Sequence, residues 1–178
     1  MKNPEKGLSC LIIILISLTS CFTVSEIPRE AHNTLIEGVP FYPQEAYQCG
    51  PSSLAGVLNY WGVYVSPDDI AQEIFSESVK GTLNLDMLLY TKRKGLRAVY
   101  YSGSIKDIKR NIDLGYPLIV LVDLGISLYQ ANHFMVVIGY NEKGLIVNSG
   151  KKRESFVREE DFLRAWKKTD FWTLLIKK

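Results

Sequence analysis

Residues 49–62, Cys-Gly-Pro-Ser-Ser-Leu-Ala-Gly-Val-Leu-Asn-Tyr-Trp-Gly, predict the first strong helix of the chain. Pro51 suits the first turn of a helix, where a backbone N–H has no partner within the helix and its absence costs nothing. Apolar residues follow at helical spacing as far as Trp61, and Gly62 is expected to end the helix. Cys49 is therefore expected where this helix begins.

Downstream of this helix, the sequence predicts further helices and then strands. Ser66-Pro67-Asp68-Asp69 is typical of a helix start, and other helices are expected near 84–94, 104–114 and 158–166. Apolar patterns predict extended segments at 96–101, 118–124, 133–140, 145–149 and 171–176, with a hairpin turn at 141–144. Val39 to Tyr42 is expected to be a short extended piece limited by prolines. Helices followed by an antiparallel sheet indicate an α+β domain.

The N-terminus has the features of a bacterial targeting segment. An apolar run over 8–18 follows two lysines, and it is too short for a comfortable transmembrane helix. It ends in Leu18-Thr19-Ser20-Cys21, which resembles a lipobox, whose cysteine receives lipid. We expect a lipoprotein signal peptide over 1–20, a lipidated Cys21, a spacer over 21–38 and a folded domain over 39–178. The alternatives are an ordinary secretory signal cut near Ser20 and an uncleaved anchor.

A lipid anchor would place the domain at the surface of a bacterial envelope. Phe22 is not the aspartate typical of inner-membrane retention, so an outer-membrane anchor facing the periplasm is expected if the host has two membranes. The net charge of +2 gives no strong field for nucleic acid. The sequence has no Gly-rich phosphate loop and no Cys/His metal cluster, so no nucleotide or metal cofactor is expected. The sequence leaves the oligomeric state open.

Cys49 is the one thiol expected to remain in the folded domain, because Cys10 leaves with the signal peptide and Cys21 carries lipid. A helix N-terminus presents unpaired N–H groups and a positive dipole, which favour the nucleophilic thiolate. The alternative is a buried cysteine that acts as a small apolar residue. A cysteine nucleophile needs a base. His32 falls in the spacer, so His133 is the expected partner, unless His133 is only a core residue.

A third group usually orients the imidazole. A turn centred on Glu142-Lys143 would place Asn148 opposite Val137, on the face of the sheet that holds His133 but about 13 Å farther along. Asn148 can therefore reach His133 only through a bend, strong twist or bulge. Asp123, at the end of the preceding strand, is the alternative orienting residue.

Donors to an oxyanion are the last requirement for acyl transfer. The Cys49 backbone N–H is one candidate. Gln44, five residues upstream, is the other, because its loop could fold back over the start of the helix. Gln48 is adjacent to Cys49 and is expected to point elsewhere.

The segment Gln44-Glu-Ala-Tyr-Gln-Cys49-Gly-Pro-Ser-Ser-Leu54 resembles the active-site segment of C39-like peptidases, a papain-like group that includes bacteriocin-leader processing domains. His133-Phe-Met-Val-Val-Ile-Gly-Tyr140 resembles the histidine strand of that family, and the hairpin through Asn148-Ser149 resembles the His…Asn hairpin of papain. The resemblance implies a papain-like α+β fold and a cysteine peptidase that acts on peptides or proteins. Together with the lipobox-like segment, it predicts a membrane-anchored peptidase. It implies Cys49 as nucleophile, His133 as base, Asn148 as orienting residue and Gln44 as oxyanion donor.

Two departures from the family pattern leave other functions possible for this domain. C39 members usually carry Asp-Pro where this chain has Asn148-Ser149, and often Asp where it has Gln48. The alternatives are a catalytically inactive, lipid-tethered peptide-binding module and a thiol acyltransferase or amidase on the same fold. The resemblance covers a peptidase domain only, so it does not imply cleavage after a Gly-Gly leader.

Overall fold

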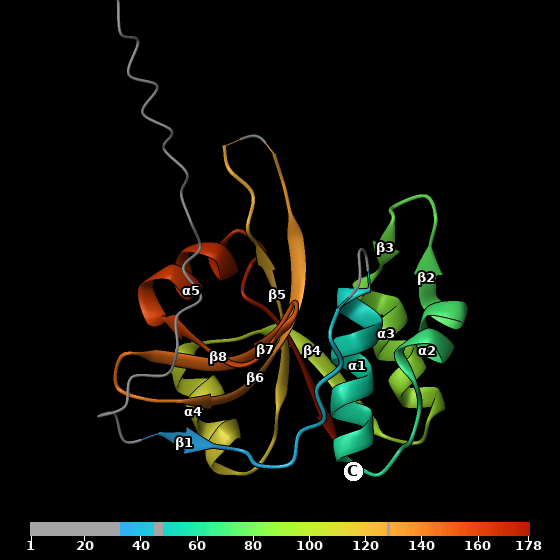
Figure 1. Ribbon diagram of the computed structural model, residues 1–178, viewed down its shortest axis with the longest axis horizontal. Helices are drawn as coiled ribbons and strands as arrows, with labels where there is room; N and C mark the ends of the chain where they lie inside the picture. The colour runs from blue at the N-terminus through green and yellow to red at the C-terminus, as the bar shows by residue number, and fades with distance from the viewer. Residues whose placement is uncertain (1–32, 45–47, 128) are drawn as a thin grey trace, which may run out of the picture.

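The computed structural model describes residues 33–44, 48–127 and 129–178. The predicted signal peptide, Cys21 and His32 lie outside these residues. Figure 1 shows two parts, with helices α1 to α3 gathered on one side and a twisted sheet with α4 and α5 on the other. Within the described residues, no helix is both long and apolar enough to cross a membrane.

The helical part begins with α1 (Cys49–Tyr60), as predicted, and Gly62 follows it with a φ of +84°. Helix α2 (Pro67–Ile74) starts with a capping box, in which the Ser66 hydroxyl accepts from the Asp69 N–H at 3.1 Å and the Asp69 carboxylate accepts from the Ser66 N–H. Helix α3 (Asn84–Arg93) packs beside α2.

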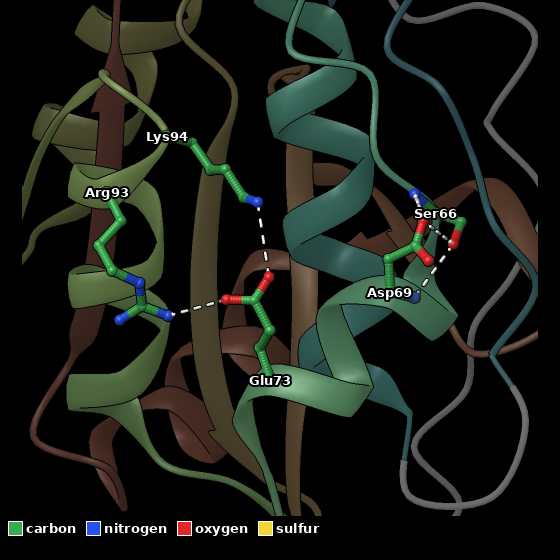
Figure 2. A network of polar contacts seen from close by, with 5 residues as sticks. All are labelled: Ser66, Asp69, Glu73, Arg93 and Lys94. Atoms are coloured by element: carbon green, nitrogen blue, oxygen red, sulfur yellow. Dashed lines mark hydrogen bonds and ion pairs between the residues drawn. The ribbon is translucent and has the colours of Figure 1, made fainter.

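A carboxylate on α2 joins these two helices. Glu73 pairs with Arg93 at 3.2 Å and with Lys94 at 3.5 Å, and both pairs appear in Figure 2 together with the capping box. Each pair is solvent-exposed and contributes little stability by itself. Between α2 and α3 the chain forms a two-stranded antiparallel hairpin, β2 (Phe75–Ser76) with β3 (Gly81–Thr82), in which Phe75 pairs with Thr82.

The sheet is antiparallel throughout and has the order β4-β9-β5-β6-β7-β8, with β1 also paired to β6. Its strands are β1 (Thr34–Leu35), β4 (Arg97–Ser102), β5 (Leu118–Asp123), β6 (Asn132–Tyr140), β7 (Gly144–Ser149), β8 (Lys152–Arg158) and β9 (Trp172–Lys177). Helices α4 (Ile105–Asp113) and α5 (Glu159–Lys167) complete the fold.

The core lies on both faces of this sheet. Every residue of β5 is buried, which explains why its sequence is a continuous apolar run rather than an alternating one. Helix α1 contacts β5 and β6 from one side, and α5 contacts β5 from the side of α4 (Figure 1). The indole of Trp166 on α5 is fully buried and donates to the Trp172 carbonyl at 3.0 Å.

The fold confirms the predicted α+β class and differs from the prediction in four places. Strand β8 was not predicted, and neither was the β2–β3 hairpin. Val39 to Tyr42 forms no strand. The predicted spacer reached residue 38, but Thr34–Leu35 pair with β6 and Ile36 is buried, so the folded part begins before Val39.

Candidate active site

Cys49 and His133 line one cleft of about 850 Å³. Cys49 opens α1 and is partly exposed, while His133 is the second residue of β6, the strand against which α1 packs. Gln44 and Gly150 line the same cleft. The structure therefore brings together three of the four predicted site residues.

The thiol of Cys49 is protonated in this setting. Burial raises its pKa above the ordinary value, and backbone hydrogen bonds from Phe134, Gly50 and Cys49 itself lower it by less. The stabilisation expected at a helix N-terminus is therefore present, but burial outweighs it. Burial of Cys49 therefore opposes the thiolate that the helix N-terminus was predicted to favour.

His133 is neutral near pH 7, because burial lowers the pKa of its imidazole to about 4. Its Nε2 atom is hydrogen-bonded to the Ser149 hydroxyl at 2.9 Å. With Nε2 engaged there, Nδ1 is the other ring nitrogen of His133. The cleft thus holds an uncharged thiol and an uncharged imidazole.

Ser149, not Asn148, contacts His133. A β-bulge between Val137 and Gly139 shifts the β6–β7 register by one, so Asn148 lies opposite Val136 rather than the predicted Val137. Val136 is three residues from His133, which puts Asn148 on the other face of the sheet. The predicted bulge does occur, but its one-residue shift in register brings Ser149 to the imidazole instead of Asn148.

Asn148 is buried and supports the turn between β7 and β8. Its Oδ1 accepts from the Glu154 N–H at 2.9 Å, and Glu154 has a φ of +52°. Its Nδ2 has no partner within the part of the chain that the structure describes. The side chain therefore fixes the far end of the turn that carries Ser149.

Asp123, the alternative orienting residue, is committed elsewhere. Its Oδ1 accepts from the N–H groups of Gly125 and Ala131, each at 2.8 Å, and so organises the turn between β5 and β6. Burial raises the pKa of Asp123, but these two hydrogen bonds and nearby Lys168 lower it by more, so the net shift is downward. Val122, not Asp123, is the residue opposite His133.

Gln44 is held by the β7–β8 turn. Its Oε1 accepts from the Gly150 N–H at 3.1 Å, and its own N–H donates to the Gly150 carbonyl at 2.9 Å. Its Nε2 makes only a long contact of 3.4 Å to the Ser53 hydroxyl on α1. One turn, through Ser149 and Gly150, therefore positions both the imidazole and the amide.

The far wall of the cleft was not predicted. It comes from the β2–β3 hairpin and the start of α3, and it comprises Val79, Lys80, Gly81, Thr82, Leu83, Asn84 and Leu85. These strands are two residues long and carry no periodic signal. Gln48 does not line the cleft, and its side chain donates to Asp68 on α2 at 3.3 Å.

The chemistry available here is that of a thiol, an imidazole and amide donors. In the described ranges, no three His, Cys, Asp or Glu side chains are grouped so that they could hold a metal ion. A thiol with a neighbouring imidazole and N–H donors has the components for nucleophilic acyl transfer.

Solved structures of proteins described as peptidases or peptidase domains share this fold. A protein from Bacillus anthracis described as a C39-like peptidase superposes with a TM-score of 0.69 at 19% identity, covering 83% of this chain and 98% of that one. The peptidase domain of Streptococcus ComA, a bifunctional ABC transporter, gives 0.65 at 22% identity, covering 78% and 98%. A double-glycine-motif protease of an AMS/PCAT transporter, solved with its leader peptide, gives 0.64 at 26% identity, covering 79% and 91%.

The amino-acid sequence agrees with the fold. An uncharacterized protein of Methanothermobacter thermautotrophicus is 26% identical over 121 residues, which are 68% of this chain and 78% of that protein. The sequence model of the Peptidase_C39 like family matches residues 36–173, which include every cleft residue described above. The chain therefore belongs to the Peptidase_C39 like family.

Proposed function

We propose that the protein is a cysteine peptidase that hydrolyses peptide bonds, with Cys49 as nucleophile and His133 as base. The observation that carries the proposal is that one cleft is lined by the thiol at the start of α1, the imidazole on β6 and the Gln44 amide. No other cysteine lies within the described residues, so no other thiol there could be the nucleophile.

In the proposed reaction, His133 Nδ1 takes the thiol proton as Cys49 Sγ attacks the substrate carbonyl carbon. The Cys49 N–H and Gln44 Nε2 donate to the oxyanion. Collapse breaks the C–N bond, and the proton passes from His133 to the leaving amine. Water, deprotonated by His133, then hydrolyses the thioester, which returns the thiol and releases the acid.

Ser149 is the proposed positioning residue for His133. Its hydroxyl can accept a hydrogen bond from Nε2–H, which leaves Nδ1 unprotonated and able to act as the base. A hydroxyl carries no charge, so it stabilises the imidazolium less than a carboxylate would. Asn148 acts indirectly, because it supports the turn that carries Ser149.

We further propose that the substrate is a peptide or protein met at a bacterial membrane surface. The leader-peptide complex of the transporter protease supports a peptide substrate. The lipobox-like Leu18-Thr19-Ser20-Cys21 supports a lipid on Cys21, with an outer-membrane anchor if the host has two membranes. Replacement of Cys21 by serine is expected to abolish palmitate labelling and to release the protein from the membrane fraction, and a membrane-bound variant would count against the lipid.

Cleavage of a peptide library, read by mass spectrometry, tests the reaction. The wild type is expected to cleave a defined subset of peptides, and Cys49→Ala is expected to abolish all cleavage while the melting temperature stays nearly unchanged. Cleavage that survives in Cys49→Ala would assign the activity to another group. A large loss of stability with activity intact would identify Cys49 as a core residue.

The uncharged resting pair favours a second candidate, a peptide-binding module without catalysis. Both pKa shifts oppose transfer of the proton from Cys49 to His133 in the free protein. If this candidate is correct, library peptides bind equally well to the wild type and to Cys49→Ala, and neither protein cleaves them.

A further inference from the structure

The described part of the cleft carries one charged side chain, and it is positive. Lys80, in the turn between β2 and β3, lines the cleft, and no aspartate or glutamate among the described residues does so. Cys49 and His133 add no charge near neutral pH, because burial raises the pKa of the thiol and lowers that of the imidazole. A cleft lined by charge of one sign attracts ligands of the opposite sign.

The charge of Lys80 is not neutralised within the described part of the chain. Lys80 is exposed, and the ion pairs between described residues all join other side chains. Glu77 belongs to the same turn, and its carbonyl accepts from the Lys80 N–H at 3.4 Å. The Glu77 carboxylate, however, forms no ion pair with Lys80, and Glu77 does not line the cleft. The ammonium group is therefore available to a ligand.

The conformation of the turn does not explain why a lysine stands there. Lys80 has a φ of +47°, in the left-handed region that favours glycine and tolerates asparagine. In Figure 1 this turn stands beyond the start of α1, and the β5–β6 hairpin that carries His133 lies on the other side of α1. Lys80 and His133 therefore belong to different walls of the cleft, and a bound peptide would lie between them.

We propose that Lys80 binds a carboxylate of the peptide substrate, which makes Lys80 a specificity-determining residue and acidic peptides the substrate class. This inference rests on the proposed peptidase function. An ammonium group donates a charge-assisted hydrogen bond to a carboxylate, and the exposure of Lys80 to water keeps the contribution modest. The carboxylate can belong to an acidic side chain or to the C-terminus of the peptide, since both present the same chemistry.

Matched peptide libraries test this charge preference on the full-length protein. Three libraries carry Glu, Gln or Lys at each position in turn, each with a free or an amidated C-terminus. Mass spectrometry gives relative kcat/KM values for the wild type, and affinity selection on Cys49→Ala gives binding without catalysis. Both are measured at about 0.01 M and about 1 M salt, where the Debye length is about 30 Å and about 3 Å.

Four variants change the charge in a controlled way. Lys80→Asn removes it with a residue that suits a positive φ, Lys80→Arg keeps it, and Lys80→Glu reverses it. Lys106→Gln is the matched control, because it neutralises another exposed lysine without an ion pair, on α4 and outside the cleft.

At low salt the wild type should cleave Glu peptides about two- to fivefold faster than Gln peptides, the range of an exposed ion pair, and Lys peptides more slowly still. If the C-terminus supplies the carboxylate, free acids should instead show this advantage over amides. The preference should vanish in Lys80→Asn and at high salt, persist in Lys80→Arg and Lys106→Gln, and turn toward Lys peptides in Lys80→Glu. The melting temperature of Lys80→Asn should not fall.

Three outcomes would overturn the inference. A preference for acidic peptides that Lys80→Asn retains would assign it to another group. Slower cleavage of every peptide by Lys80→Asn, with a lower melting temperature, would mean that Lys80 only supports the turn. Cleavage by the wild type without any preference for carboxylates would remove the contact and spare the peptidase. By contrast, selection of acidic peptides by Cys49→Ala, when the wild type cleaves none, would support the Lys80 contact and count against the peptidase.

Discussion

Acidification is expected to destabilise this protein through His133. Burial lowers the imidazole pKa to about 4 in the folded protein, whereas an imidazole in an unfolded chain titrates near 6.5. Between these two values the unfolded chain binds the proton and the folded protein does not. The free energy of unfolding therefore falls as the pH drops through this window, and the contribution of His133 is retained above pH 6.5.

The size of this effect follows from the two pKa values. A difference of about 2.5 pKa units corresponds to about 3 kcal/mol between pH 7 and pH 4. This is an upper limit, because His133 is only partly buried and water that reaches the ring reduces the penalty for charging it. Even about 2 kcal/mol is a large share of the 5–15 kcal/mol that typically stabilises a domain.

Urea unfolding at a series of pH values measures this dependence. Other carboxylates also titrate below pH 6, so the informative quantity is the difference between the wild type and His133→Gln, which cannot be protonated. His32→Gln is the matched control, since it removes the other histidine and should keep the wild-type slope. If His133→Gln loses as much stability as the wild type between pH 7 and pH 4, to within about 0.5 kcal/mol, the imidazole is not buried as described.

Three further perturbations probe the site. Ser149→Ala should lower kcat/KM by at least about tenfold with little change in melting temperature. Ser149→Asp should raise the His133 pKa by about one unit or more in an NMR titration. An unchanged pKa would mean that residue 149 does not contact the imidazole. Gly150→Ala meets no atom within 4 Å but imposes a φ of +58° on alanine, so it should cost about 1 kcal/mol in urea unfolding; no cost would mean that the turn relaxes freely. Alkylation of Cys49 by iodoacetamide should reach half its maximal rate above the pH expected for a free thiol, because burial raises the thiol pKa, and a midpoint below about 8 would contradict this.

Elements with local signals were predictable from the sequence. Ser66-Pro67-Asp68-Asp69 predicts the start of α2, and the structure confirms a capping box there. Ser104 caps α4 in the same way, accepting from the Asp107 N–H at 3.1 Å. The apolar run of β5 predicts a strand buried on both faces, and all six residues are buried. Each of these signals comes from residues within the helix or strand itself or directly beside it in the sequence.

Elements that depend on distant partners were not predictable. Strand β8 reads Lys-Arg-Glu-Ser-Phe-Val-Arg, a polar segment that becomes a strand by pairing with β7. The bulge between Val137 and Gly139 has no local marker beyond a glycine, yet it decides which residue reaches His133. A shift of one residue in the pairing register moves each side chain of the strand to the opposite face of the sheet. The prediction therefore selected Asn148, although the residue in contact is its neighbour Ser149.

The charge state of the site is also set by distant contacts. A helix N-terminus can be predicted from sequence and favours a thiolate. The burial that opposes it arises only when α1 packs against β6, which covers Cys49 and His133 together. No carboxylate lines the described part of the cleft, and Ser149 is uncharged, so little offsets that burial. A peptidase built this way must form its ion pair inside the substrate complex, where the oxyanion donors and the leaving amine take up the charge. Its activity should therefore depend more steeply on contacts with the substrate than on the pH of the medium.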